Sequence, residues 1–380
     1  MRYKLQHLDE YENLMVKRIR ELSPPLTDDI GANTYRAIVM RYFFQHNSIR
    51  RRRLAEGKKL IGSRAKPVTK AFRELWVVKA EKESTYEVFE GFQQFEKLLF
   101  QSPEYRGHYV HQFDVFLLGH YILNKMLKEC DRISQKLRVS NNPNFTWMLA
   151  STFHDMGYPI EQIENWFSHF LRMFLKVDVP FQIDIEKILS QSFYDYLGYL
   201  SEWHYAMRTG TIAVSGRSIG RDWKFHEKLQ TSLRRKDHGV ISSLLLMHSL
   251  LTQEKISLYR NWFVSIFPYE ILPACHAISV HNLGFEDFKI GLSTYPYAFL
   301  LTLCDVLQDW RRCAPGKDYS ELKDFNFRCR RSFPILEFKL KINLPKKEKE
   351  IIGLQEKLTT NGLMEVSIQK ENGDSICSLE

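Results

Sequence analysis

The stretch Leu149-Ala150-Ser151-Thr152-Phe153-His154-Asp155-Met156-Gly157-Tyr158-Pro159 places an adjacent imidazole and carboxylate at the end of an apolar run. Burying an ionised carboxylate is unfavourable unless a cation, strong hydrogen-bond donors or solvent lies beside it. A divalent metal ion meets that demand. The stretch therefore predicts a metal site in apolar, helical surroundings.

The apolar spacing stays helical nearly throughout residues 105–312. His111 shares one helix face with Val115, Leu118 and Ile122, at positions i+4, i+7 and i+11, and this is the face that a core would bury. Three further segments have the same character: 237–251, 274–283 and 297–310.

The chain before this region predicts helices with polar breaks over residues 8–100. Ser23-Pro24-Pro25 closes the first helix, and Thr27-Asp28-Asp29 can cap the next. Between residues 50 and 70 nine cations face one anion, and the stretch carries no interleaved aromatic residues. Two interpretations stay open: a solvated loop and helix face, or a patch that faces phosphate. The nine cations are Arg50, Arg51, Arg52, Arg53, Lys58, Lys59, Arg64, Lys66 and Lys70.

The chain after Arg312 changes character at Pro315-Gly316. Residues 335–342 alternate apolar and charged side chains as a half-buried strand does, 346–357 can form a short amphipathic helix, and 363–369 a second strand. We therefore expect a mainly α protein in three parts. These are a helical N-terminal region over 1–104, an all-helical core over 105–315 and a small α+β appendage over 316–380.

Composition favours phosphate-bearing partners, because 54 Lys and Arg against 45 Asp and Glu give the 380 residues a net charge of +9. Six cysteines without CxxC spacing indicate a reducing compartment. The amino terminus has no signal-peptide core, and the longest apolar stretch, near 297–307, is too short to span a bilayer. We expect a soluble cytoplasmic protein with no membrane partner, and the oligomeric state stays open.

Six residues in similar apolar surroundings are candidates for the metal site. Imidazole and carboxylate together suit Mn, Fe, Co, Ni or Zn. Each residue alone has an ordinary explanation, because a single histidine on an apolar face is commonly a hydrogen-bonded core residue and a helical Asp is commonly a cap or an ion-pair partner. The candidates are His111, His154, Asp155, His238, His281 and Asp305.

Their order, His, His-Asp, His, His and Asp, resembles the HD-domain metal-dependent phosphohydrolases. This all-helical superfamily includes cyclic-nucleotide phosphodiesterases, HD-GYP proteins, deoxynucleotide triphosphohydrolases and CRISPR-associated HD nucleases. The resemblance covers roughly residues 105–312, just over half of the chain. A His-Asp pair alone means little, whereas five blocks in the family's order carry the likeness.

The resemblance implies two divalent ions, for which Mg is a further choice. A water between them would be acidified enough to attack phosphorus, and the ions would neutralise charge on the phosphoryl oxygens. Asp155 would bridge to a second ion held also by His238 and His281, and these two histidines favour the dinuclear branch over the smaller set of many triphosphohydrolases. The first ion would be held by His111, His154, Asp155 and Asp305.

Two details depart from the family pattern or stay open. His276 lies five residues before His281, so either could be the ligand, and we prefer His281. Relatives often carry Lys in an HDxGK motif where this chain has Tyr158, so a cation near the phosphate must come from elsewhere. Arg235 and Lys236 are the nearest candidates. We treat Tyr158 and both cations as candidate phosphate contacts, and Lys236 also as a candidate catalytic residue.

Two residues upstream of the first ligand add further candidates. Phosphodiesterase relatives place the acid for the leaving group slightly before that ligand, which makes His108 a candidate general acid or, alternatively, a surface or supporting histidine. Arg106 could contact phosphate or be an ordinary exposed arginine.

Three functions follow as hypotheses. The first is a metal-dependent phosphohydrolase that cleaves a phosphoester, of a nucleotide or cyclic nucleotide, through a metal-bridged hydroxide. The second is an HD-type nuclease on single-stranded nucleic acid, suggested by the charge and the 50–53 arginine run. The third is a catalytically weak HD-domain regulatory or binding protein, suggested by Tyr158.

Overall fold

The computed structural model describes residues 10–21, 30–56, 65–80, 108–137, 140, 142–178, 181–189, 192–210, 220–252, 267–283, 289–308, 321–330, 333–342 and 345–380. The chain divides into two compact units, one formed by residues 1–136 with 303–380 and the other by residues 137–302. The two units group residues that lie close together in space. They do not test the three parts expected from the sequence, so the boundaries after residues 104 and 315 stay a prediction. Each unit is described by itself.

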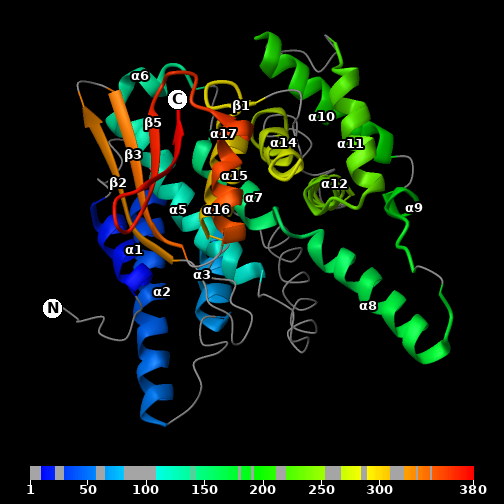
Figure 1. Cartoon of the computed structure of the whole chain (residues 1–380), viewed down its shortest axis with the longest axis horizontal. Helices are drawn as coiled ribbons and strands as arrows, with labels where there is room; N and C mark the ends of the chain where they lie inside the picture. The colour runs from blue at the N-terminus through cyan, green and yellow to red at the C-terminus, as the bar shows by residue number, and fades with distance from the viewer. Residues whose placement is uncertain are drawn as a thin grey trace. The chain divides into compact units, whose positions relative to one another are not determined.

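The expectation of a mainly α protein is confirmed, because helices dominate the described residues and the larger sheet is confined to the C-terminal part (Figure 1). The helices of the first unit are α1 (Glu10–Glu21), α2 (Ile30–Ala55), α3 (Ala65–Ala80), α5 (His108–Glu129), α6 (Asp131–Ser134), α16 (Pro345–Ile352) and α17 (Leu354–Lys357). Its strands are β2 (Glu321–Arg330), β3 (Phe333–Lys341), β4 (Leu358–Thr359), β5 (Glu365–Lys370) and β6 (Ser375–Leu379).

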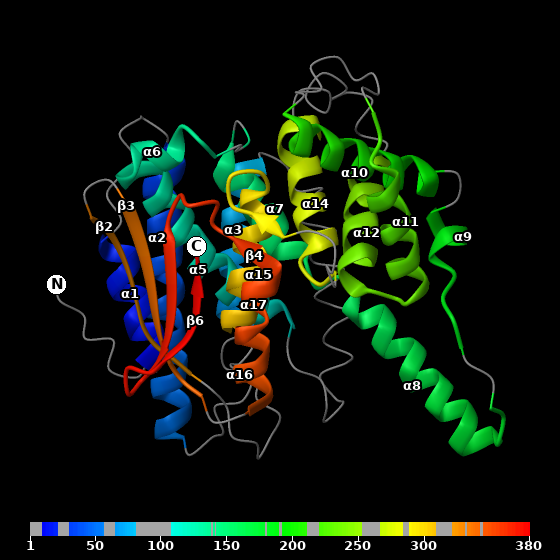
Figure 2. The ribbon, with the colours of Figure 1, turned by 45° about the horizontal axis from the view of Figure 1, so that its top comes forward.

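The sheet of the first unit has the strand order β2-β3-β5-β6 (Figures 1 and 2). The outer pairs are antiparallel and the central pair, β3 with β5, is parallel. A parallel connection needs a crossover, and α16 with α17 supply it and pack against β6. At the other edge α1 and α5 pack against β2, where the ring of Tyr121 meets Phe325 edge to face at 5.2 Å.

Helix α5 is buried on every side. The sequence predicted one buried face, whereas each residue from 111 to 124 lies in the interior. A helix that is covered all round belongs to a core. This burial holds His111 and the two residues that follow it away from solvent, Gln112 at 0% and Phe113 at 0% exposed.

The second unit is a helical assembly in which α14 is central, because α14 packs against α7, α10 and α12. Its bounds are α7 (Pro143–Phe153), α8 (Tyr158–Leu175), α9 (Ile185–Leu189), α10 (Ser192–Thr209), α11 (Trp223–Arg234), α12 (His238–Thr252), the π-helix η2 (Phe267–Ile271), α14 (Leu272–Val280) and the short strand β1 (Ile290–Gly291). Helix α15 (Pro296–Gln308) begins in this unit and ends in the first, since the division falls within it.

Local sequence explains where the key helices begin. Asn142 caps α7 by accepting a hydrogen bond from the backbone N–H of Phe145 at 3.1 Å, and proline occupies the first turn, where its missing N–H costs nothing. Asp237 does the same for α12, accepting from the N–H of Val240 at 3.1 Å. These caps fix which residue opens each helix, and His238 opens α12.

The predicted elements with chemistry-bearing residues agree with the described ones to within a few residues at their ends. The basic stretch divides between the last turns of α2 and the start of α3, and its members Lys58, Lys59 and Arg64 lie outside the described residues. Among the described helices, none is both long enough and apolar enough to cross a bilayer.

Candidate metal centre

The His-Asp pair lies in the turn between α7 and α8, directly after the last residue of α7. Both side chains are almost completely buried, with His154 at 0% and Asp155 at 1% exposed. Nδ1 of His154 lies 2.9 Å from the backbone carbonyl of Ser151, so in the neutral ring Nδ1–H donates there and Nε2 carries the lone pair. This is the arrangement that metal-binding histidines use, with the distal N–H held by a carbonyl or carboxylate.

His281 has the same arrangement at the end of α14. It follows Val280, the last residue of that helix, and its Nδ1 lies 2.6 Å from the carbonyl of Ile278. In the neutral ring, Nε2 therefore carries the lone pair, as a metal-ligating nitrogen must. The ring centroids of His281 and His154 are 5.4 Å apart and nearly perpendicular, so the two helix ends bring their histidines together.

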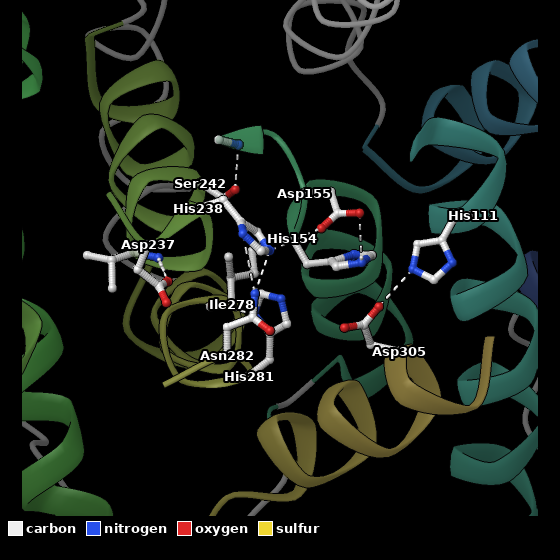
Figure 3. A network of polar contacts seen from close by, with 12 residues as sticks. His111, His154, Asp155, Asp237, His238, Ser242, Ile278, His281, Asn282 and Asp305 are labelled. Atoms are coloured by element: carbon white, nitrogen blue, oxygen red, sulfur yellow. Dashed lines mark hydrogen bonds and ion pairs between the residues drawn. The ribbon is translucent and has the colours of Figure 1, made fainter. Parts of the chain in front are cut away.

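His238 approaches the pair from the first residue of α12. Its Nε2 lies 3.5 Å from Oδ1 of Asp155 and 2.5 Å from Nδ2 of Asn282 (Figure 3). Its ring is half-buried, and its centroid is 5.6 Å from that of His281. The ends of α7 and α14 and the start of α12, all in one unit, therefore bring candidate metal-ligand atoms together.

Asp155, His238 and His281 each offer one ligand atom, and all three atoms lie within 4.8 Å of one another. Two ligand atoms at about 2.1 Å from a shared ion are separated by at most about 4.2 Å. The three ligand atoms would therefore have to move only slightly closer together to hold one ion. A carboxylate with two imidazoles suits Mn, Fe, Co, Ni or Zn. The donor set of this unit therefore fits a divalent transition metal.

Two glycines permit this convergence. A Cβ on Gly157 would lie 2.5 Å from the carbonyl of His238, and a Cβ on Gly239 would lie 2.7 Å from the carbonyl of Ile278 and 2.9 Å from the ring of His281. Any side chain would push α12 away from its neighbours. The backbone N–H of Gly157 also donates to Oγ of Ser242 at 2.7 Å, which ties the turn to α12.

The first unit contributes a separate pair. His111, on α5, places Nε2 2.7 Å from Oδ1 of Asp305, on α15 (Figure 3). The imidazole is almost fully buried, and the carboxylate is partly so. This is a second imidazole and carboxylate combination, of the composition expected for the first ion.

His276 lies elsewhere, although it is as deeply buried as His281. Its Nε2 is 3.0 Å from Nδ1 of His204, whose own Nε2 is 3.3 Å from the hydroxyl of Tyr295. Burial lowers the pKa of His204 to about 3 and lowers that of His276 well below its usual value. The structure thus separates the two alternatives, with His281 beside Asp155 and His276 in a neutral hydrogen-bonded chain.

The candidate phosphate contacts have mixed placements. The ammonium of Lys236 forms an ion pair with the carboxylate of Glu164 on α8, and Arg235 is exposed at the end of α11. The ring of Tyr158 is 5.8 Å from that of His238 and perpendicular to it, so Tyr158 does lie beside the cluster. Their contacts with phosphate stay predictions.

The two upstream candidates are described only in part or not at all. His108 is the first residue of α5, and its side chain is outside the described residues, as is Arg106 altogether. Their roles as acid and phosphate contact stay predictions.

Asn282, Gly239 and Ser242 support the cluster and were absent from the sequence-based set. A partial signal existed for two of them, because Asn282 directly follows His281 and Gly239 directly follows His238. No motif pointed to Ser242. Its partner Gly157 is 85 residues away in the chain.

Comparison with protein-family models, curated proteins and solved structures gives no match. The resemblance to HD-domain phosphohydrolases therefore rests on the motif residues of the sequence alone.

Proposed function

We propose that the protein is a metal-dependent phosphohydrolase that cleaves a phosphoester, of a nucleotide or cyclic nucleotide, in the cytoplasm. One observation carries the proposal. The buried carboxylate of Asp155 lies within 4.8 Å of ligand atoms of His238 and His281, and the Nδ1–H of His281 is held by a carbonyl, which places the ring's lone pair on Nε2.

The proposal assigns two ions. The second ion takes Asp155, His238 and His281, which all belong to one unit. The first ion takes the set that the family resemblance implies. That set is His111, His154, Asp155 and Asp305.

Bound divalent ions would acidify a water molecule and neutralise charge on the phosphoryl oxygens. The chain's own residues prepare the site for them. Asp155 supplies negative charge in a buried position, where a cation is needed to balance it. The carbonyls of Ser151 and Ile278 orient His154 and His281. Burial of these rings keeps water away from the ligand atoms.

The test is metal analysis of the purified full chain, followed by a screen of nucleotides, cyclic dinucleotides and single-stranded DNA with Mn. We expect bound divalent metal and hydrolysis of at least one phosphoester, and we expect Asp155→Asn to lose both. His276→Gln is the matched control, because it alters a buried histidine of the same unit outside the cluster. A chain that takes up no divalent ion would refute the proposal, whereas metal without any hydrolysis would favour the regulatory protein.

The nuclease is retained as a second candidate because Arg51 and Arg52 are exposed in the last turns of α2. Binding through many phosphates weakens steeply with salt. A nuclease should therefore lose activity on single-stranded DNA as salt rises and should lose it further in Arg51→Ala/Arg52→Ala. Activity on a small nucleotide that is insensitive to both changes would favour the phosphohydrolase.

A further inference from the structure

Two cysteines far apart in the sequence meet in the first unit. Cys130 lies between α5 and α6, and Cys329 lies near the end of β2. Their sulfur atoms are 3.1 Å apart, across 199 residues of chain. A disulfide bond measures about 2.05 Å, so a movement of about 1 Å shared by two side chains would allow the bond to form.

The two thiols differ in access. Cys130 is buried at 2% exposure, whereas Cys329 is exposed on β2, an edge strand of the sheet. Burial, together with the neighbouring thiol and the acidic Glu129 and Asp131, raises the pKa of Cys130 to about 12. An exposed thiol next to a buried one is the arrangement of an attacking cysteine with its resolving partner.

We propose that Cys130 and Cys329 are a thiol pair that a small-molecule disulfide such as oxidised glutathione converts into an intramolecular disulfide. The thiolate of Cys329 attacks one glutathione sulfur, which breaks the glutathione disulfide and releases one glutathione thiol. Cys130 then attacks the Cys329 sulfur and releases the second glutathione. The protein loses two protons and two electrons, and the oxidant gains them.

The bond would join the end of α5 to the edge strand. Helix α5 already packs against β2 without the bond. The same helix carries His111 near its other end. In a reducing compartment such a bond is transient, which suits a reversible modification and not a permanent structural link.

The experiment incubates the reduced full chain with oxidised glutathione and digests it without reductant for mass spectrometry. We expect a peptide in which Cys130 is linked to Cys329, at a mass lower by two hydrogen atoms, and its loss when dithiothreitol is added. Cys377→Ser is the matched control, since Cys377 is a buried cysteine of the same sheet, and this variant should form the linked peptide fully.

The single variants distinguish the two roles. Cys130→Ser should accumulate glutathione on Cys329, because the resolving thiol is gone, whereas Cys329→Ser should leave Cys130 unmodified. Absence of the linked peptide in the parent chain would overturn the pairing. Glutathione on Cys130 in the Cys329→Ser variant, at the rate seen for Cys329, would overturn the order of attack.

A different feature, in the second unit, carries a second inference. Helix α8 and the residues after it expose large apolar side chains, and Figures 1 and 2 both show α8 extending away from α12. Trp166, Phe170 and Phe174 are spaced four residues apart, so they form a single stripe. Phe167 and Phe181 flank the stripe with their ring centroids 4.7 Å apart.

The exposed area is close to what a dimer needs. These five aromatic rings are between 36% and 77% exposed. At about 150–250 Å² for each aromatic side chain, they present roughly 400–650 Å² per chain. A standard interface buries about 800 Å² per partner, and the neighbouring Met173 and Leu175 are also exposed.

Charge favours a second copy over a lipid surface. Among the charged side chains described in residues 158–178, those of Arg172, Lys176 and Asp178 are exposed, and Arg172 is paired with Asp178, so the described surface of this segment is not rich in Lys and Arg. A membrane-surface helix is rich in Lys and Arg on its polar face. We infer that the α8 stripe packs against the α8 stripe of a second copy of this chain about a two-fold axis, an arrangement in which the same residues serve both partners.

Size-exclusion chromatography with light scattering tests this inference on the full chain. We expect a dimer that Phe174→Glu converts to a monomer, while Trp223→Glu, which alters an exposed aromatic residue of α11, stays dimeric. A monomeric parent chain at micromolar concentration would overturn the inference. Binding to neutral lipid vesicles that Phe174→Glu abolishes, by a monomeric chain, would assign the stripe to a membrane instead.

Discussion

Two groups of buried histidines in the second unit differ in what completes their hydrogen bonds. In the first group, His154 and His281 donate Nδ1–H to carbonyls three residues earlier in the chain, which leaves Nε2 as an acceptor. The carboxylate of Asp155 lies 3.6 Å from Nε2 of His154. The group thus combines acceptor nitrogens with a buried negative charge.

In the second group the partners are a histidine and a phenol. Nε2 of His276 lies 3.0 Å from Nδ1 of His204, and Nε2 of His204 lies 3.3 Å from the hydroxyl of Tyr295, which donates to the carbonyl of His204 at 3.2 Å. The His204 ring is stacked between Phe225 and Tyr295, at centroid distances of 4.0 and 5.0 Å. The partners described for these rings are imidazole, hydroxyl and carbonyl groups, in place of the carboxylate of the first group.

The contrast shows that burial does not identify a metal ligand. His276 and His281 are five residues apart and equally buried, yet only His281 lies beside a carboxylate. The two histidines differ in the groups that their ring nitrogens contact and in whether a carboxylate lies beside the ring. Each of the following variants tests one side of this difference.

The largest effect is expected for Asp155→Ala, because this residue is proposed to contact both ions and no ligand in the proposed set can replace it. Bound metal and phosphoester hydrolysis should both fall to background in elemental analysis and activity assays. Asp222→Ala is the control. It removes a buried Asp that caps α11, which should cost about 1 kcal/mol of stability and no metal. An Asp155→Ala protein that still held two ions per chain would end the bridging assignment.

His238→Ala should be milder for metal content, since His238 is assigned to the second ion only. We expect about one ion per chain to remain, with activity near zero, because catalysis is proposed to need both ions. Metal titration by calorimetry would measure the stoichiometry. Loss of both ions would require a different division of the ligands.

The pair His281→Ala and His276→Ala tests the comparison directly. His281→Ala should weaken the second metal by 10-fold or more, about 1.4 kcal/mol per decade. His276→Ala should retain metal and instead lose roughly 1–3 kcal/mol of folding stability, because a buried hydrogen-bond partner is removed. The opposite pattern would transfer the ligand to His276. If neither variant changes the metal content, the assignment of a second ion fails. Only the ligand set of the first ion then remains.

Much of the fold followed from periodicity, and the elements that were missed show why some did not. The strand predicted over 335–342 is β3, whose buried side chains alternate as expected. Strand β2 was not predicted, because a register shift between Leu322 and Asp324 breaks its alternation, so that Leu322, Phe325 and Phe327 are buried at uneven spacing. Strand β6 has only five residues, Ser375–Leu379, which is too short for its alternation to stand out in the sequence.

The residues of the candidate site could be picked out from the sequence, whereas the contacts that support them could not. The motif order pointed to Asp155 and His281 because the family pattern is read along the chain. The ion pair of Lys236 joins it to Glu164, 72 residues away, and a sequence cannot reveal such a partner. The same holds for the close approach at Gly239, which depends on how α12 meets α14.

The smallest effect concerns pH and the neutral histidine group. Burial lowers the pKa of His204 to about 3 and that of His276 well below the usual value, so the folded protein stays unprotonated where the unfolded chain binds protons. The free energy of unfolding should therefore be highest above about pH 6.5 and fall as pH drops below it, by at most about 1.4 kcal/mol per pH unit for each histidine. His226 and His248, whose pKa values burial also lowers, add to the same slope.

Urea unfolding with EDTA present, at about pH 7.5 and about pH 5.5, would measure this slope without the metal contribution. The double variant His204→Phe/His276→Leu replaces both hydrogen-bond partners with apolar groups of similar size, so it should fold and show a shallower slope. His169→Gln is the control, because it removes an exposed histidine of α8 and leaves the buried pair in place. A double variant as pH-sensitive as the parent chain would mean that the buried pair does not stay neutral, and the contrast between the two groups would then rest on Asp155 alone.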